Sequence, residues 1–412
     1  KGKIVDYLAA KADVVVRSQG GNNAGHTVVT GGKAYPLRLM PSGIMYPGTI
    51  CIVGTGVVVD PKSFLEEMEK LEAQGINAKH LQISTRAQVV FPYHIRLDEA
   101  EEMRKGSRKL GTTKNGIGPC YADKINRIGI RMCDLMDKEV FAEKLKYNVE
   151  QKNMLLEKLY GMEGFDYEQM LIDYLGYAEK LRPYVKDTNY TVQTLVREGK
   201  NVLFEGAQAS MLDCDNGTYP FVTSSHPTAG GACIGAGIGP HMMQNIFGVV
   251  KAYSTRVGEG PFPTEQVNEI GDRIRDIAHE FGTVTGRPRR VGWLDARAVR
   301  YAAALNSFDY LAITRLDILD ELEEIKVCVG YEYEGKPVKE YPADLKFLSK
   351  VTPVYKTYKG WKEKISAIRD YDRLPALCKE YLADISKEIG VPIGIVSVGP
   401  SREETIVVKD VF

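Results

Sequence analysis

Short apolar runs alternate with amphipathic segments along most of the chain. The β-branched runs at 14–16 and 50–53 predict strands that are buried on both faces. Comparable runs recur at 202–204, 247–250, 310–313 and 393–396. Each run is followed by a polar or glycine-rich loop. This alternation predicts an α/β fold with a large central, mostly parallel β-sheet flanked by helices, and binding sites beyond the carboxyl ends of the strands.

Helix signals fill the intervals between these runs. Asp60-Pro61 reads as an N-cap followed by proline at the first helical position, and Gly75 closes that helix. A longer charged helix is predicted over 137–161, with the apolar set Val140, Phe141, Leu145, Val149, Leu155, Leu156 and Leu159. We expect a single domain over 1–412, with a helical inserted region around 137–195. The opening residues 1–8 read as a helix already under way.

Composition and charge narrow the class of protein. The 412 residues are 44% hydrophobic and 26% charged, and 54 basic residues balance 54 acidic ones. The balance argues against a nucleic-acid coat or an anionic-membrane binder, and no run approaches the roughly 20 apolar residues of a membrane-spanning helix. Seven cysteines without a CxxC pair argue against a disulfide framework or structural zinc. We expect a cytoplasmic protein with no nucleic-acid or membrane partner.

Five loops could carry chemistry, although each is open to a plainer interpretation as a solvated turn. The glycine-rich stretch 19–27 lets backbone N–H groups approach an anion, and His26 there could donate a proton. The stretch 111–119 combines hydroxyls, glycines and a lysine, which suits a phosphate. The third loop consists of 204–208 and 219–225. Its Gln208 side chain offers both a donor and an acceptor, as a purine edge requires.

The last two loops carry charge. The stretch 282–293 holds three arginines within four residues, which can fork onto carboxylates or phosphates. A nucleic-acid role for it lacks interleaved aromatic residues. Asp317, just after a strand, could accept hydrogen bonds from guanine N1–H and N2–H₂ together. Jointly the five loops predict a site for anions and a purine base.

Long stretches of the sequence resemble the adenylosuccinate synthetase family over essentially the whole chain. The matching stretches are KGKIVDYL, RSQGGNNAGHTVV, PSGI, GTTKNGIGPCYADK, FEGAQ, GTYPFVTSSHPTAGG, KAYSTRVGEGPFPTE, TGRPRRVGWLD and TRLDILD. The resemblance implies a P-loop-NTPase-like architecture. It also implies GTP-dependent ligation of IMP and L-aspartate to adenylosuccinate, through 6-phosphoryl-IMP, with release of GDP and phosphate. This is the first committed step from IMP to AMP.

The resemblance also assigns roles to individual residues. It makes His26 and Gln208 catalytic and the Gly25 carbonyl a ligand of one Mg²⁺ per subunit. The implied IMP set is Lys1, Asn23, Ala24, Gly25, His26, Thr113, Arg127, Gln208, Thr223 and Arg287. The implied aspartate set is Thr283, Val284, Thr285, Gly286, Arg287 and Arg289. The implied GTP set is Lys1, Gly2, Lys3, Arg289, Arg315, Leu316, Asp317, Ser397, Val398 and Gly399. The family is homodimeric, with Arg127 reaching the neighbouring active site.

Two departures from the family pattern affect these expectations. The family's catalytic aspartate precedes the two lysines of a GDEGKGK loop, which match Lys1 and Lys3, so this sequence does not contain it. A chain that truly started at Lys1 would be a catalytically dead nucleotide-binding homologue. Arg315 replaces the usual lysine, and it can stack on a base at least as well. A P-loop-like GTPase with another acceptor is the other alternative, but it leaves RPRR and GTYPFVTSS unexplained.

Overall fold

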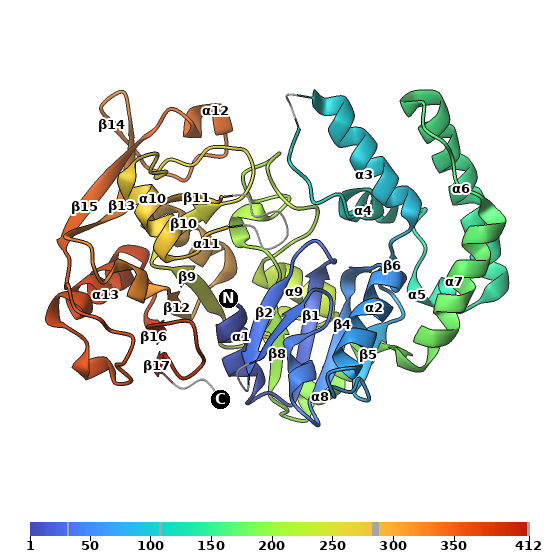
Figure 1. Ribbon diagram of the computed structural model, residues 1–412, viewed down its shortest axis with the longest axis horizontal. Coiled ribbons are helices and arrows are strands. Elements are labelled where there is room, and N and C mark those ends of the chain that lie inside the picture. The colour runs from blue at the N-terminus through green and yellow to red at the C-terminus, as the bar shows by residue number, and fades with distance from the viewer. Residues whose placement is uncertain (31–32, 107–108, 282–287, 410–412) are drawn as a thin grey trace.

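The computed structural model describes residues 1–30, 33–106, 109–281 and 288–409 (Figure 1). A six-stranded parallel sheet forms the blue-green part of the molecule, in the order β7-β5-β4-β1-β8, with β6 also paired to β4. Its strands are β1 (Val14–Gly20), β4 (Ile50–Val59), β5 (Leu81–Ser84), β6 (Gln88–Val89), β7 (Val185–Lys186) and β8 (Val202–Glu205). The runs predicted at 14–16, 50–53 and 202–204 are therefore strands.

A second sheet has the order β17-β16-β12-β9 and is parallel except for its edge strand β17. Its strands are β9 (Phe247–Lys251), β12 (Tyr310–Thr314), β16 (Ile393–Ser397) and β17 (Thr405–Val407). A third sheet consists of β10 (Tyr253–Arg256), β11 (Arg290–Asp295), β13 (Glu324–Tyr333), β14 (Lys336–Val338) and β15 (Thr352–Lys359). Strands β2 (His26–Thr30) and β3 (Lys33–Leu37) form a separate antiparallel pair. The prediction of a mostly parallel α/β architecture is confirmed.

Helices cover both faces of the first sheet because successive strand residues point to opposite sides. Cys51 and Val53 belong to the core shared with α2 (Pro61–Glu72), α6 (Lys138–Tyr160) and α7 (Tyr167–Leu181). Ile52 faces the other core, under α8 (Thr188–Arg197) and α9 (Ala229–Ala236). Helix α9 approaches the sheet so closely that a Cβ on Gly235 would lie 1.8 Å from the Ser18 carbonyl oxygen.

Eight further helices are found in the described residues. They are α1 (Gly2–Ala9), α3 (Pro92–Lys105), α4 (Ile117–Ile125), α5 (Met132–Leu135), α10 (Glu269–Ile277), α11 (Ala296–Asn306), α12 (Leu345–Leu348) and α13 (Ala376–Ile389). Short 3₁₀ turns are η1 (Ser42–Met45), η3 (Arg182–Tyr184), η4 (Ser210–Leu212), η5 (Pro240–Met242), η6 (Leu316–Leu319) and η7 (Tyr371–Arg373). None of the helices described in these ranges is long and apolar enough to cross a membrane.

The predicted helix boundaries hold where capping chemistry is explicit. Asp60 accepts hydrogen bonds from the backbone N–H groups of Lys62 and Ser63 at the start of α2. Helix α6 begins after Asp137 and ends at Gly161, which is left-handed with φ 64°. The predicted apolar set of α6 is only half right, because Val140, Leu155 and Leu159 are exposed while Phe141, Leu145, Val149 and Leu156 are buried. Helices α6, α7 and α8 occupy most of 137–195, and the division of the chain into one domain with an insertion stays a prediction.

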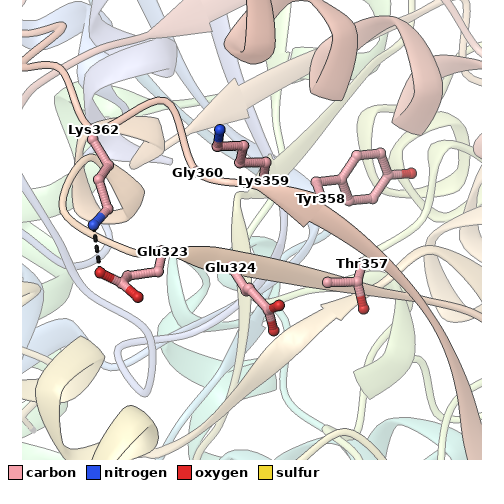
Figure 2. A pocket seen from close by; sticks show the side chains of 7 residues that line it. All are labelled: Glu323, Glu324, Thr357, Tyr358, Lys359, Gly360 and Lys362. Atoms are coloured by element: carbon pink, nitrogen blue, oxygen red, sulfur yellow. Dashed lines mark hydrogen bonds and ion pairs between the residues drawn. The ribbon is translucent and has the colours of Figure 1, made fainter.

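A cavity of about 1110 Å³ separates the facing edges of β8 and β9. Its walls are largely apolar along the strands, and Lys1, Gln19, Glu205, Gln208 and Lys251 lie around it. A smaller hollow of about 420 Å³ lies at one end of the β13–β15 pair, where Lys362 pairs with Glu323 (Figure 2). That hollow shares no lining residue with the five predicted loops. The cavity beside β8 is therefore the one that adjoins the predicted chemistry.

Candidate active site

The carboxyl ends of β1 and β8 bring the first and third predicted loops together. Strands β1 and β8 are parallel neighbours, so both end at the same edge of the sheet. The Gln19 amide donates to the Ala207 carbonyl at 2.8 Å and to the Gln208 side-chain oxygen at 3.2 Å. The Gln208 amide in turn donates to Asn23 Oδ1 at 3.3 Å. Asn23 and Gln208, 185 residues apart in the sequence, therefore share one hydrogen-bond network, and Gln19 is a member of it that sequence reasoning missed.

His26 lies at the start of β2 against two polar groups that the sequence did not single out. Its Nε2 is 2.7 Å from Ser42 Oγ and 3.5 Å from Glu205 Oε1. Glu205 is fully buried, and its Oε2 accepts a hydrogen bond from the Ser42 backbone N–H at 2.9 Å. Its Oε1 has no hydrogen-bond partner. The available signal for Glu205 was an acidic residue ending an otherwise apolar strand.

The protonation state of His26 follows from these surroundings. Burial lowers the pKa of His26 to about 4, although the charge of Glu205 opposes the shift. His26 is therefore neutral at pH 7. A neutral imidazole retains one N–H, which it can donate to an oxygen that is gaining negative charge.

Helix α1 carries two of the predicted nucleotide-contacting lysines into the site. The Lys1 ammonium donates to the Gly206 carbonyl, and burial lowers the Lys1 side-chain pKa to about 8. Lys3 donates to the carbonyls of Gly399 at 2.8 Å and Glu404 at 2.9 Å, and burial lowers its pKa to about 8 as well. One short helix thus contacts the loop after β8 and the loop after β16.

The predicted guanine-reading residues follow β12 and β16, which are parallel neighbours. Asp317 lies in η6 with a buried Oδ1 that has no hydrogen-bond partner, and burial raises its pKa. Ser397 ends β16, and its hydroxyl donates to the Gly399 carbonyl at 3.2 Å. Arg315 turns away, because its guanidinium donates to the Ala278 carbonyl and to Tyr253 Oη. A buried acceptor without a hydrogen-bond partner destabilises the protein, so the Asp317 carboxylate is suited to accept hydrogen bonds from two donors of a ligand.

Glu280 forms a buried cluster that sequence reasoning missed. It pairs with Lys251, accepts from Tyr253 Oη at 2.6 Å and accepts from Arg289 Nη1 at 2.6 Å. Burial acts to raise the pKa of Glu280, but the Lys251 charge and these hydrogen bonds lower it to about 2. Arg289, predicted to bind aspartate and GTP, is therefore held by Glu280. The predicted residues Thr283, Val284, Thr285, Gly286 and Arg287 lie outside the described part of the chain.

Thr113 and Arg127, which the resemblance assigns to IMP, lie beyond opposite ends of α4. Two carboxylates of α3 hold the loop before α4 by hydrogen bonds. Asp98 accepts from the Thr112 hydroxyl and the Gly116 backbone N–H. Glu102 accepts from three successive backbone N–H groups, those of Leu110, Gly111 and Thr112. Thr113 is exposed on this loop, and Gly118 lies against Ser224, the neighbour of Thr223. Arg127 is exposed beyond the other end of α4, in the left-handed region with φ 64°. The described residues thus place Gly118, near the start of α4, beside the neighbour of Thr223, and Arg127 beyond the other end of that helix.

The fold and the site together define a class of protein. The loops after the parallel strands of two sheets carry an amide network beside a histidine and an aspartate with an unpaired buried oxygen, and Lys1 and Lys3 contact loops of both sheets. This combination is that of a nucleotide-using enzyme that handles phosphate groups.

Comparison with known proteins identifies the family within this class. Residues 1–406 match the adenylosuccinate synthetase family. The adenylosuccinate synthetases of Brachyspira hyodysenteriae and Caldanaerobacter subterraneus are 58% and 56% identical over 412 residues, which is 100% of this chain and 96% of each relative. The fully ligated Plasmodium falciparum enzyme superposes with a TM-score of 0.93 at 40% identity, covering 99% of this chain and 96% of that one. The chain belongs to the adenylosuccinate synthetase family.

A more distant structure supports the fold alone. The cyanophage S-2L succinoaminodeoxyadenylate synthetase, bound to dGMP and dATP, superposes with a TM-score of 0.60 at 20% identity. It covers 98% of this chain and 91% of its own. The architecture is therefore shared by a protein whose sequence has diverged widely.

Proposed function

We propose that this protein ligates IMP and L-aspartate to adenylosuccinate, using GTP as co-substrate. The γ-phosphate of GTP is transferred to the 6-oxygen of IMP. The aspartate amine then attacks C6, and phosphate leaves with that oxygen. The observation that carries the proposal is the Asn23–Gln208–Gln19 network beside His26, at the point where β1 and β8 end. Membership of the family and the match over residues 1–406 support it.

In this proposal His26 and Gln208 act on the 6-oxygen and the base of IMP. His26 donates its N–H to the 6-oxygen as charge grows there, and Ser42 with Glu205 holds the imidazole in place. Gln208 presents its amide to the base. Lys1, Asn23, Ala24, Gly25, Thr113, Thr223 and Arg287 complete the proposed IMP set.

GTP is proposed to lie between α1 and the ends of β12 and β16. Asp317 accepts two hydrogen bonds from guanine with its unpaired buried carboxylate, and Arg315 contacts the base face once it leaves Ala278. The proposed GTP set also includes Lys1, Gly2, Lys3, Arg289, Leu316, Ser397, Val398 and Gly399. L-Aspartate is assigned to residues 283–287 and to Arg289, whose guanidinium forks onto a carboxylate.

The residues present also fit Mg²⁺, which is part of the proposal. Gly25 is exposed, so its carbonyl can serve as a ligand, and Gln19 Oε1 and Glu205 Oε1 are buried oxygens without hydrogen-bond partners in the same site. These are the hard oxygen donors that Mg²⁺ prefers. When bound, one Mg²⁺ per subunit would neutralise charge on the transferring phosphate.

A homodimer and a cytoplasmic location complete the proposal. Arg127 is exposed at the far end of α4 from Thr113, which suits a residue that serves the IMP phosphate of a neighbouring subunit.

The test is phosphate release from GTP by the protein purified from its natural source, in Mg²⁺. IMP and aspartate are supplied together and then omitted one at a time. Release that requires both, with adenylosuccinate accumulating in step, is expected. Release that continues without either would point instead to a GTPase with another acceptor. No release from folded protein would favour a catalytically dead nucleotide-binding homologue.

A further inference from the structure

The loop between η4 and α9 contains a cluster of metal-ligating side chains that the ligase chemistry does not use. Asp213, Cys214 and His226 each present one ligand atom, and these atoms all lie within 4.8 Å of one another. Cys214 Sγ is 3.5 Å from His226 Nδ1 and 3.6 Å from Nε2. Thiol and imidazole are the ligands of zinc and related transition metals, whereas Mg²⁺ prefers oxygen.

Asp213 is positioned to orient the imidazole. Its side chain is fully buried, and its Oδ1 accepts hydrogen bonds from Asp215 N at 3.1 Å, Asn216 N at 2.9 Å and Asn216 Nδ2 at 3.2 Å. These bonds fix the carboxylate, so that Oδ2 faces His226 Nδ1 at 3.1 Å. A carboxylate that receives the Nδ1 proton leaves the Nε2 lone pair for a metal, which is the usual arrangement behind a histidine ligand.

Cys214 Sγ and His226 Nε2 lie close enough for one tetrahedral metal to contact both. At Zn–S of about 2.3 Å and Zn–N of about 2.1 Å, two ligands at a tetrahedral angle lie about 3.6 Å apart. Cys214 Sγ and His226 Nε2 are separated by that distance. The sulfur is nearly equidistant from the two ring nitrogens, so Cys214 has to rotate about its side chain for a metal on the in-plane lone pair of Nε2 to contact Sγ as well.

A further ligand and an entry path are also present. An Asp215 carboxylate oxygen lies 3.9 Å from His226 Nε2, and Asp215 is 75% exposed on its side chain. The His226 side chain is 41% exposed, so an ion can reach Nε2 from solvent.

We propose that Cys214 and His226 bind one zinc-class divalent cation, with Asp213 hydrogen-bonded behind His226 and with Asp215 and water completing the coordination. On binding, the Cys214 thiol releases its proton to solvent and the sulfur binds as thiolate. The site is separate from the proposed Mg²⁺ position at Gly25 and uses different ligand chemistry. The two ligands lie at the two ends of segment 214–226, which contains Thr223. The backbone N–H of Thr223 donates to the Leu212 carbonyl at 2.9 Å.

The test uses Co²⁺ as a spectroscopic probe, added to protein that has been freed of metal by a chelator and then kept in excess Mg²⁺. The expected result is one Co²⁺ per chain, with a thiolate-to-cobalt charge-transfer band and the intense visible bands of tetrahedral cobalt. One equivalent of Zn²⁺ should remove these bands. Cys214→Ser should abolish the charge-transfer band, and Asp213→Asn should weaken binding by roughly 10- to 100-fold.

The matched control is Cys133→Ser, because Cys133 is the exposed cysteine of the described residues and lies on α5, outside the cluster. It should bind Co²⁺ like the wild type. Absence of a charge-transfer band in the wild-type protein would overturn the proposal, as would a band that survives in Cys214→Ser and disappears in Cys133→Ser. Because Cys214→Ser removes a partly exposed side chain, its melting temperature should stay close to that of the wild type, and His226→Gln provides a second variant that should lose the same bands.

Discussion

Replacing His26 by alanine separates a catalytic role from a structural one. If His26 donates to the 6-oxygen of IMP in the transition state, kcat should fall by roughly 10²- to 10⁴-fold, the usual range for a positioned acid. That fall corresponds to about 2.7–5.4 kcal/mol of barrier height. KM for IMP should change little, because the lost interaction strengthens mainly as charge develops.

The structural cost of the same change is smaller. His26→Ala removes one hydrogen bond, between Nε2 and Ser42 Oγ at 2.7 Å, worth roughly 0.5–1.5 kcal/mol. With an unfolding entropy of about 2.1 cal/mol/K per residue, 412 residues give about 0.9 kcal/mol/K. The melting temperature should therefore drop by only about 1–2 °C from this hydrogen bond, too little to account for a hundredfold loss of turnover by unfolding.

The assay is release of phosphate from GTP with IMP and aspartate present, alongside a thermal melt of each variant. Ser42→Ala is the matched control, because it removes the same hydrogen bond and leaves the imidazole in place. It should retain most of the activity that His26→Ala loses. Turnover of His26→Ala within a few-fold of wild type, at an unchanged melting temperature, would show that His26 is not the donor.

Three further predictions test other parts of the site. Asp317→Asn should reduce the preference for GTP over other purine triphosphates by about 10- to 150-fold, since hydrogen bonds to a charged group contribute roughly 1.5–3 kcal/mol; an intact preference in competition kinetics would remove Asp317 as the base reader. Arg127→Leu should raise KM for IMP and be rescued by mixing with His26→Ala subunits, and failure of rescue would argue against a shared site. Glu280→Gln should lower the melting temperature at pH 7 by about 2–4 °C, the equivalent of roughly 2–3 kcal/mol. Because the pKa of Glu280 is lowered from 4.5 to about 2, its contribution is fully present above pH 4.5 and is lost as the pH falls toward 2. Melts that show the same deficit at pH 7 and at pH 3 would mean that the charge of Glu280 is not what stabilises the fold.

Local sequence patterns determined the secondary structure because their causes are local. The β-branched runs at 14–16 and 50–53 form buried strands, and the caps at Asp137 and Gly161 set the ends of α6. The apolar pattern of α6 was less informative about burial. Leu159 lies five turns after Phe141 and therefore on the same side of α6, yet Phe141 is buried and Leu159 is exposed, so burial also changes along the length of the helix.

The motifs of the sequence by themselves determined the family and the residues around which the site is built. Only the tertiary structure decided which polar groups support them. Glu205 faces His26 from 179 positions away, and Glu280 pairs with Lys251 at the end of β9 and with Arg289 just before β11. No periodicity encodes such contacts, because each joins residues that are apart in the sequence and meet only when the chain folds. The same physical reason applies to Cys214 and His226, which a turn of the chain brings within ligand distance.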